Sequence, residues 1–297
     1  MRRITWQAGA EDDGKALRAV LRGSMGLSAS LVKAVKWLPD GILLDGAPAR
    51  LDAVVRRGQT VSVALSVKQS AECPVCARQA PPMPPILYED DCLLVVDKPA
   101  GMAVHPSAGH EEGTLFDAVS AWLRQKGDEN STFCPISRLD RHTSGVLCAA
   151  KNRFAAQRLS EQRQKGQMRR VYRAVVCGSG LRDNGVVDAP IARAQGIRRA
   201  VALEGQRAVT HWQVLRRGQK HMLLELWLET GRTHQIRVHM AHLGFPVYGD
   251  FLYGTEDPSH PGFALHAQSL SFVHPLDSRP MSLSAPMPPW FDTLLED

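Results

Sequence analysis

The most informative stretch of this 297-residue chain is Ser137–Gly145, which reads SRLDRHTSG. It places one carboxylate, Asp140, between two arginines and directly before a Thr-Ser-Gly sequence. Ser and Thr hydroxyls bond nearby backbone groups and Gly tolerates positive φ, so the pattern predicts a turn. An isolated Asp in such a turn is most often a surface residue or a helix cap. A second cluster, Gly231–His239 (GRTHQIRVH), favours a functional site instead.

Together the two clusters resemble signature blocks of the pseudouridine synthases, specifically the family of the ribosomal large-subunit and related tRNA enzymes. The usual family block reads His-Arg-Leu-Asp-x-x-Thr-Ser-Gly, and this chain keeps all of it except the first position, where it has Ser137. The resemblance covers roughly residues 86–290 and includes three further blocks, an opening strand pair with a Lys-Pro-x-Gly loop and two closing blocks: Ile86–Asp91 with Leu94–Met102, Pro246–Asp250 and Leu265–Ala267. Single short motifs match by chance, but five in the family's order are hard to explain otherwise.

The resemblance implies an RNA pseudouridine synthase with an α+β fold, in which a mixed, largely antiparallel sheet carries the active site in a central cleft. Asp140 occupies the family's catalytic position, and Arg232 is similar to the arginine that pairs with that aspartate. Tyr172 matches the tyrosine that stacks on the base and is a candidate for the base that removes the C5 proton. The family's usual Lys two positions before it is Arg170 here, which keeps the charge but changes the geometry. Arg138 could fill the gap left by a uridine that leaves its stack.

Forming pseudouridine breaks the N1–C1′ bond of a uridine and rejoins the uracil through C5, without redox change or phosphoryl transfer. No Gly-rich phosphate loop or dinucleotide fingerprint is present, so we expect no cofactor. Of the six cysteines only Cys73 and Cys76 are closely spaced, and no second ligand pair follows them. We therefore expect no metal and free thiols in a reducing cytosol, and leave the role of this pair open.

Three zones follow one another along the chain: residues 1–67, a proline-rich linker at 68–85, and a catalytic domain at 86–297. The first zone resembles the S4-type RNA-binding module, a small α/β domain with a helix pair and a strand–turn–strand. Its formal charge is +4, from ten Lys or Arg and six Asp or Glu, and Lys33 and Lys36 are candidates for RNA binding. Because proline denies the linker helix and central strand, we expect a flexible attachment with few contacts across the boundary.

Hydrophobic periodicity and capping residues predict several individual elements. The expected helices are residues 16–21, 27–36, a helix capped by Thr114, and 234–243, which ends at Gly244. The expected strands are residues 41–44, which enter an Asp-Gly turn, 61–65, 171–177 and 222–228.

The whole chain has a formal charge of +6 and a pI near 9.1, which is compatible with a polyanionic partner. Lys151–Arg173 contains eight basic residues and one acid, and beside the Asp140 block we interpret it as a surface that tracks phosphates rather than only a solvated helix face. No apolar run is long enough for a membrane span and the N-terminus lacks a signal-peptide pattern, so we expect a cytoplasmic protein.

The sequence therefore predicts a pseudouridine synthase acting on RNA, with large-subunit ribosomal RNA favoured and tRNA as the alternative substrate. Two other classes stay open at this point. One is a non-catalytic RNA-binding protein on the same scaffold, although such a protein has no chemical reason to retain Asp140, Tyr172 and Arg232. The other is a glycosidase or nucleoside hydrolase, which would generally place two acids around the glycosidic bond.

Overall fold

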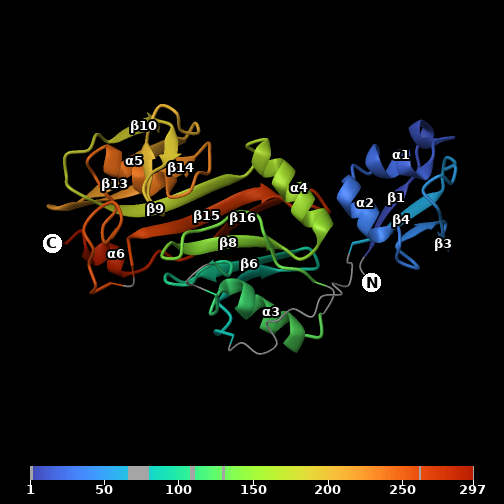
Figure 1. The fold of residues 1–297 in the computed structure, drawn as a ribbon, viewed down its shortest axis with the longest axis horizontal. Coiled ribbons are helices and arrows are strands. Elements are labelled where there is room, and N and C mark those ends of the chain that lie inside the picture. Colours follow the sequence, from blue (N-terminus) through green and yellow to red (C-terminus); the bar gives the residue numbers. More distant parts are fainter. Residues whose placement is uncertain (1–2, 66–79, 108–110, 129–130, 261, 297) are drawn as a thin grey trace.

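The computed structural model describes residues 3–65, 80–107, 111–128, 131–260 and 262–296. Two sheets dominate these residues: a small one near the N-terminus and a large one that runs through the rest of the chain (Figure 1). Residues 66–79, which hold most of the expected linker together with Cys73 and Cys76, lie outside the described residues.

The N-terminal unit is a four-stranded antiparallel sheet with two helices and a 3-10 turn. Its strands, in spatial order, are β1 (Arg3–Gln7), β4 (Thr60–Ala64), β2 (Ile42–Leu44) and β3 (Ala47–Pro48). The helical elements are η1 (Ala10–Asp12), α1 (Leu17–Arg22) and α2 (Ala29–Val35). Ser28 caps α2 by accepting a hydrogen bond from the Leu31 amide at 3.2 Å. The predicted helix pair and strand–turn–strand are present, and both residues of the Asp45-Gly46 turn have positive φ.

The large sheet has ten strands, and only β15 and β8 pair in parallel. Its main path runs β10 (Asn184–Asp188), β13 (Val209–Arg217), β14 (His221–Leu228), β9 (Arg169–Cys177), β15 (Leu265–Val273), β8 (Ser144–Ala150), β6 (Leu93–Lys98) and β5 (Ile86–Glu89). Off this path, β16 (Pro280–Ser284) pairs with β15 and β7 (Cys134–Pro135) pairs with β8. The prediction of an α+β protein with a mixed, largely antiparallel sheet is confirmed.

Helices and a small hairpin lie around this sheet: α3 (Leu115–Gln125), α4 (Arg153–Gln164), α5 (Gln235–His242), α6 (Trp290–Thr293), β11 (Ile191–Arg193) and β12 (Arg199–Val201). Thr114 begins α3 as predicted, because its hydroxyl accepts from the Asp117 amide while the Asp117 carboxylate accepts from the Thr114 amide. Among the described residues, no helix combines the length and apolar character needed to cross a membrane.

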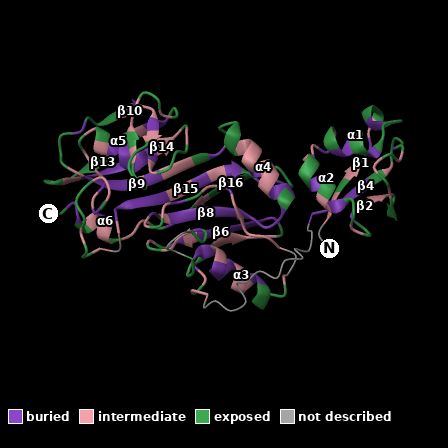
Figure 2. Ribbon diagram, in the orientation of Figure 1, coloured by how far each residue is buried: buried purple, intermediate pink, exposed green. Residues whose placement is uncertain are grey.

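The core of the large sheet lies along its central strands, which Figure 2 shows as continuous buried ribbons. β9 is the middle strand of this region and places Tyr172 between Leu226 of β14 and Ala267 of β15. On the neighbouring strand β8, Gly145 has φ 105°, and a Cβ atom there would lie 2.3 Å from the Ala267 carbonyl oxygen. Only glycine therefore lets β8 approach β15 just after the loop that carries Asp140.

The N-terminal unit packs directly on α4, the helix that separates it from the large sheet in Figure 1. Phe154 in the first turn of α4 is 2% exposed and is part of the apolar core of the N-terminal unit. Gln157 accepts a hydrogen bond from the Ser28 amide and donates to the Gly26 carbonyl oxygen, both at 2.8 Å, and Arg158 donates to the Met25 carbonyl oxygen at 3.1 Å. Contacts from α4 therefore cross a boundary at which the sequence predicts few. Burial of one Phe ring alone contributes about 1.5–3 kcal/mol.

Candidate active site

Asp140 lies in the loop between β7 and β8, and its side chain is 25% exposed. Its carbonyl oxygen accepts a hydrogen bond from the Thr143 amide at 3.1 Å, which closes the turn that the Thr-Ser-Gly sequence predicts. The side chain lines a pocket together with residues from β9, β14, β15 and the loop before α5. The pocket holds three of the predicted site residues besides Asp140, namely Arg138, Tyr172 and Arg232.

The cation bound to Asp140 is Arg237, not Arg232. The Arg237 guanidinium donates from Nη1 to Asp140 Oδ2 at 3.0 Å, and from Nε and Nη2 to the two carboxylate oxygens of Asp250 at 2.7 and 2.8 Å. Arg237 is 2% exposed and Asp250 is fully buried. Burial opposes the charge of Arg237, but its bonds to Asp250 and Asp140 prevail and raise its pKa.

Arg232 is exposed in the loop before α5, where its Nε donates to the Arg207 carbonyl oxygen at 3.0 Å. The predicted pairing of Arg232 with Asp140 is therefore corrected. The physical reason is the position of the helix: α5 begins at Gln235, and its first turn directs Arg237 to Asp250 and Asp140, while Arg232 stays exposed in the loop before it. The sequence did contain a signal for this pairing. Arg237 stands in the same GRTHQIRVH cluster, and Asp250 ends the Pro246–Asp250 block. Both are buried, and a buried arginine needs a carboxylate partner.

Aromatic rings complete the surroundings of Arg237. Its guanidinium carbon lies 4.2 Å from the Phe263 ring centre and 5.1 Å from that of Tyr253. A planar, weakly hydrated guanidinium suits such an environment. The arrangement fixes a buried cation next to the Asp140 carboxylate.

Tyr172 lies on the buried floor of the same pocket, 7% exposed. Burial raises the pKa of its hydroxyl, and the negative charge of Asp140 adds to this effect while Arg170 opposes it. The Arg170 guanidinium also approaches Gly231, where an added Cβ would lie 3.2 Å from its Nη1. Arg170 thus lies behind the pocket, between Tyr172 and the Gly231 loop, and Arg138 lies exposed among the residues that line it.

His234 lines the pocket as well and was missed by the sequence reasoning, which treated it as the start of a helix. It has φ 58° and precedes the first residue of α5. Its Nδ1 and the Tyr253 hydroxyl are 2.8 Å apart, and burial lowers the pKa of the imidazole. Gln235 holds this left-handed turn, because its Oε1 accepts from the Arg232 amide at 2.9 Å while its Nε2 donates to the Val209 carbonyl oxygen at 2.9 Å.

The Lys-Pro-x-Gly loop is hydrogen-bonded to the loop that carries Asp140. Lys98 is fully buried and its Nζ donates to the carbonyl oxygens of Pro99, Met102 and Arg141 at 2.8, 2.8 and 3.0 Å. Burial lowers the pKa of Lys98 to about 7, against the charges of Asp140 and Asp97.

Lys33 and Lys36 lie apart from this pocket, exposed on and just after α2 of the N-terminal unit. In the part of the chain that the structure describes, no three His, Cys, Asp or Glu residues gather as metal ligands would. The site is therefore built from one partly exposed carboxylate, a buried cation and a buried phenol.

The comparisons with known proteins agree with this geometry. The family model described as RNA pseudouridylate synthase matches residues 92–242, about half of the chain and the part that carries Asp140, Tyr172 and Arg237. A "Ribosomal large subunit pseudouridine synthase D" from Xanthomonas campestris is 42% identical over 85% of this chain and 80% of its own length.

This chain belongs to the RNA pseudouridylate synthase family. It is an isomerase of the class that converts uridine to pseudouridine in RNA. Another family member, the "Ribosomal large subunit pseudouridine synthase D" from Pseudomonas aeruginosa, is 38% identical over 87% of this chain and 84% of its own length. The solved structure of human RNA Pseudouridylate Synthase Domain Containing 1 is 26% identical, with a TM-score of 0.57, over 71% of this chain and 87% of that one. The predicted family, reaction class and fold are confirmed.

Proposed function

We propose that this enzyme isomerises uridines of large-subunit ribosomal RNA. The two relatives cited above that are named for that RNA align with 85% and 87% of this chain and with at least four fifths of their own length. The alternative substrate is tRNA. As an enzyme of bacterial-type ribosomal RNA, it would work in the cytoplasm.

In the proposed mechanism Asp140 acts on the ribose of the flipped uridine, either as the nucleophile at C1′ or as the base at C2′. The observation that carries this role is the bond from buried Arg237 to one oxygen of the Asp140 carboxylate, whose side chain stays 25% exposed and lines the pocket. A charge-assisted bond of this kind also fixes the orientation of the carboxylate. Arg237 is thus a positioning residue for Asp140.

Tyr172 is proposed to stack on the uracil after the N1–C1′ bond breaks, and to take the C5 proton once the new bond has formed. Its place on the pocket floor next to Asp140 supports this role. Its raised pKa keeps the phenol protonated at neutral pH. The oxygen of Tyr172 would therefore accept the C5 proton only as the phenol passes its own proton on to the carboxylate of Asp140 in the same pocket. Arg138, among the residues that line the pocket, is proposed to contact the RNA around the extruded base.

The N-terminal unit is proposed to be an S4-like RNA-binding module, with residues 80–85 and the preceding linker leading to the catalytic domain. Lys33, Lys36 and the basic face of α4 would contact phosphates, with Arg170 nearer the pocket. Docking of this unit on α4 supports a joint role, because it brings the N-terminal unit next to a second element that carries basic residues.

The reaction itself is tested by RNA that carries tritium at uridine C5. The enzyme should release one label to water for each modified site, without ATP, nicotinamide or added metal and in the presence of a chelator. Asp140→Asn should bind RNA and release nothing. Free labelled uracil in the supernatant would indicate a hydrolase, and RNA binding without any label release by the unaltered protein would indicate a binding protein.

The substrate is tested by mapping pseudouridines in total RNA from cells with and without the protein. Loss of a site in large-subunit ribosomal RNA supports the proposal. Loss of sites in tRNA alone would overturn the proposed target but leave the reaction standing.

A further inference from the structure

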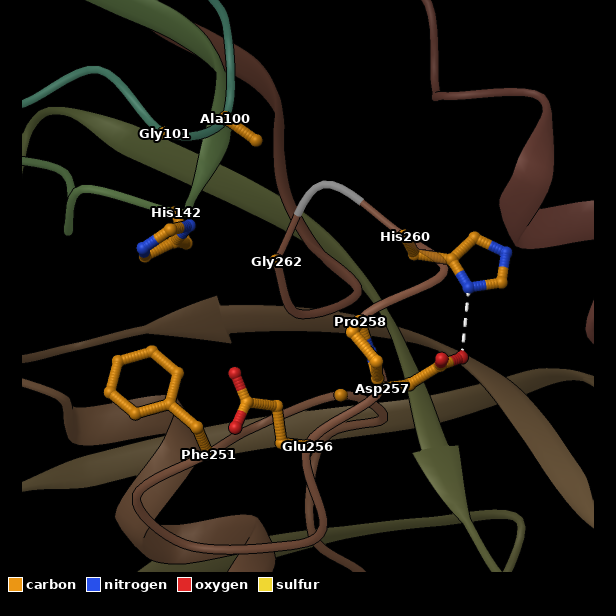
Figure 3. A pocket seen from close by; sticks show the side chains of 10 residues that line it. Ala100, Gly101, His142, Phe251, Glu256, Asp257, Pro258, His260 and Gly262 are labelled. Atoms are coloured by element: carbon orange, nitrogen blue, oxygen red, sulfur yellow. Dashed lines mark hydrogen bonds and ion pairs between the residues drawn. The ribbon is translucent and has the colours of Figure 1, made fainter.

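A second cavity lies beside the Asp140 loop, with a volume of about 470 Å³ (Figure 3). Its walls come from segments that also build the active site: Gly101 of the Lys-Pro-x-Gly loop, His142 just after Asp140, and Phe251 just after Asp250. Arg141 donates from Nε to the Gly101 carbonyl oxygen at 2.9 Å and so joins the two loops at the cavity wall. A nucleotide in this cavity would therefore belong to the same RNA segment as a uridine bound at Asp140.

One wall of the cavity is an exposed aromatic ring. Phe251 is 41% exposed, and its ring meets His142 edge-on with 5.8 Å between the ring centres. The Arg237 guanidinium carbon lies 5.8 Å from the Phe251 ring centre, so the ring is a direct neighbour of the cation that holds Asp140. A partly bare aromatic face of this kind is the platform on which proteins stack unpaired bases.

The polar side chains that line the cavity are two carboxylates, Glu256 and Asp257, and two imidazoles, His142 and His260. The two carboxylates differ. Asp257 accepts hydrogen bonds from Ser259 Oγ at 2.6 Å and from His260 at 2.9 Å, as well as from the Tyr248 hydroxyl, and these bonds, with that of Ser259 foremost, lower its pKa. Figure 3 shows Asp257 turned toward His260, while the Glu256 carboxylate lies beside the Phe251 ring. Glu256 is exposed, and it makes no hydrogen bond or ion pair within the described residues. Glu256 is thus the acceptor that a ligand would meet.

The exposed Glu256 carboxylate repels phosphate, so we assign the occupant as a base and not the RNA backbone. A carboxylate offers two acceptor oxygens, and the Watson–Crick edge of guanine offers two adjacent donors, N1–H and the N2 amino group. Adenine and cytosine present one amino donor next to an acceptor nitrogen, and uracil presents one N–H between two carbonyl oxygens. Only guanine matches both oxygens without an opposing acceptor.

We propose that this cavity binds an unpaired guanine that flanks the target uridine in the RNA, stacked on Phe251 and paired with Glu256. This inference rests on the proposed function, since it assigns a specificity subsite to the same RNA substrate. The subsite would make the enzyme select for a guanine next to the uridine. The Asp140 pocket holds the uridine itself and cannot make that selection.

The test begins with the uridine that the full-length enzyme modifies in ribosomal RNA or tRNA, and uses transcripts in which the flanking guanine is replaced by inosine or adenine. Inosine lacks the N2 amino group, and adenine lacks both donors. For the unaltered enzyme kcat/KM should fall roughly tenfold with adenine, and by less with inosine, as expected for loss of a two-pronged base contact. Glu256→Gln should show little difference among the three transcripts, and Phe251→Ala should be slow on all of them. Glu204→Gln, which removes the same charge from an exposed position outside both pockets, should behave as the unaltered enzyme.

Absence of guanine near every modified uridine, or a guanine preference that Glu256→Gln leaves unchanged, would overturn the subsite while the reaction stands. If the unaltered enzyme formed no pseudouridine in either RNA, the proposed function would fail, and the subsite with it. Circular dichroism and thermal melting of each variant would show that exposed side chains were changed without loss of the fold.

Discussion

Exchange of Arg237 for Lys, compared with the same exchange at Arg232, tests which arginine serves Asp140. Arg237 reaches two carboxylates with three bonds of 2.7 to 3.0 Å, and a Lys ammonium is a single point charge that cannot span both. We expect Lys at position 237 to stay with the fully buried Asp250 and to release Asp140. Arg232→Lys should change the rate little, since the Arg232 side chain is exposed and bonds a backbone carbonyl oxygen.

The size of the effect follows from the bond that is lost. A hydrogen bond to a charged group contributes about 1.5–3 kcal/mol, which corresponds to a fall in kcat/KM of roughly 10- to 150-fold. Stability should respond more strongly to Arg237→Met, because removal of one partner from a buried ion pair costs about 3–5 kcal/mol. Asp250 is fully buried, so the unpaired carboxylate would have no access to water.

Tritium release under single-turnover conditions measures the rate, and urea unfolding of the same preparations measures stability. Filter binding of RNA should be nearly equal for both Lys variants, which separates a positioning effect from loss of affinity. The reasoning is refuted if Arg232→Lys loses activity while Arg237→Lys retains the unaltered rate.

Three further outcomes are expected. Tyr172→Phe should keep RNA affinity and lower tritium release by about 10²–10⁴-fold, the range for loss of a general acid–base group, and full-rate release would remove the phenol from the mechanism. Phe154→Ala should cost about 3–5 kcal/mol and split thermal unfolding of the chain into two transitions in calorimetry, because α4 would no longer be joined to the N-terminal core; one unshifted transition would contradict this. Burial lowers the pKa of Lys98 to about 7, below its value in the unfolded chain, so the unfolded state binds more protons between about pH 7 and 10 and the free energy of unfolding should rise with pH there. Lys98→Met should lack that slope in urea titrations.

Several features of this protein could be predicted from the sequence because neighbours along the chain determine them. The Thr114 cap of α3 and the Asp45-Gly46 turn depend on bonds and dihedral angles within a few residues. The helix α2 and the strand β14 follow from hydrophobic periods of 3.6 and 2. The blocks around Asp140 and Tyr172 identified the family, and the structure brings those two residues into one pocket.

Tertiary structure alone decided which groups meet across the fold. Asp140 lies 97 residues before Arg237, and the position of α5 selects Arg237 over Arg232 as its partner. Docking of the N-terminal unit depends on Phe154. The position of Phe154 in the hydrophobic pattern of α4 shows that its side chain is buried, but not whether it packs on the N-terminal unit or on the large sheet. The cavity at Phe251 and Glu256 likewise exists only where three distant loops converge. Periodicity and capping report a residue's local environment, whereas a buried ion pair or an interdomain contact is selected by long-range packing and desolvation, which no short stretch of sequence encodes.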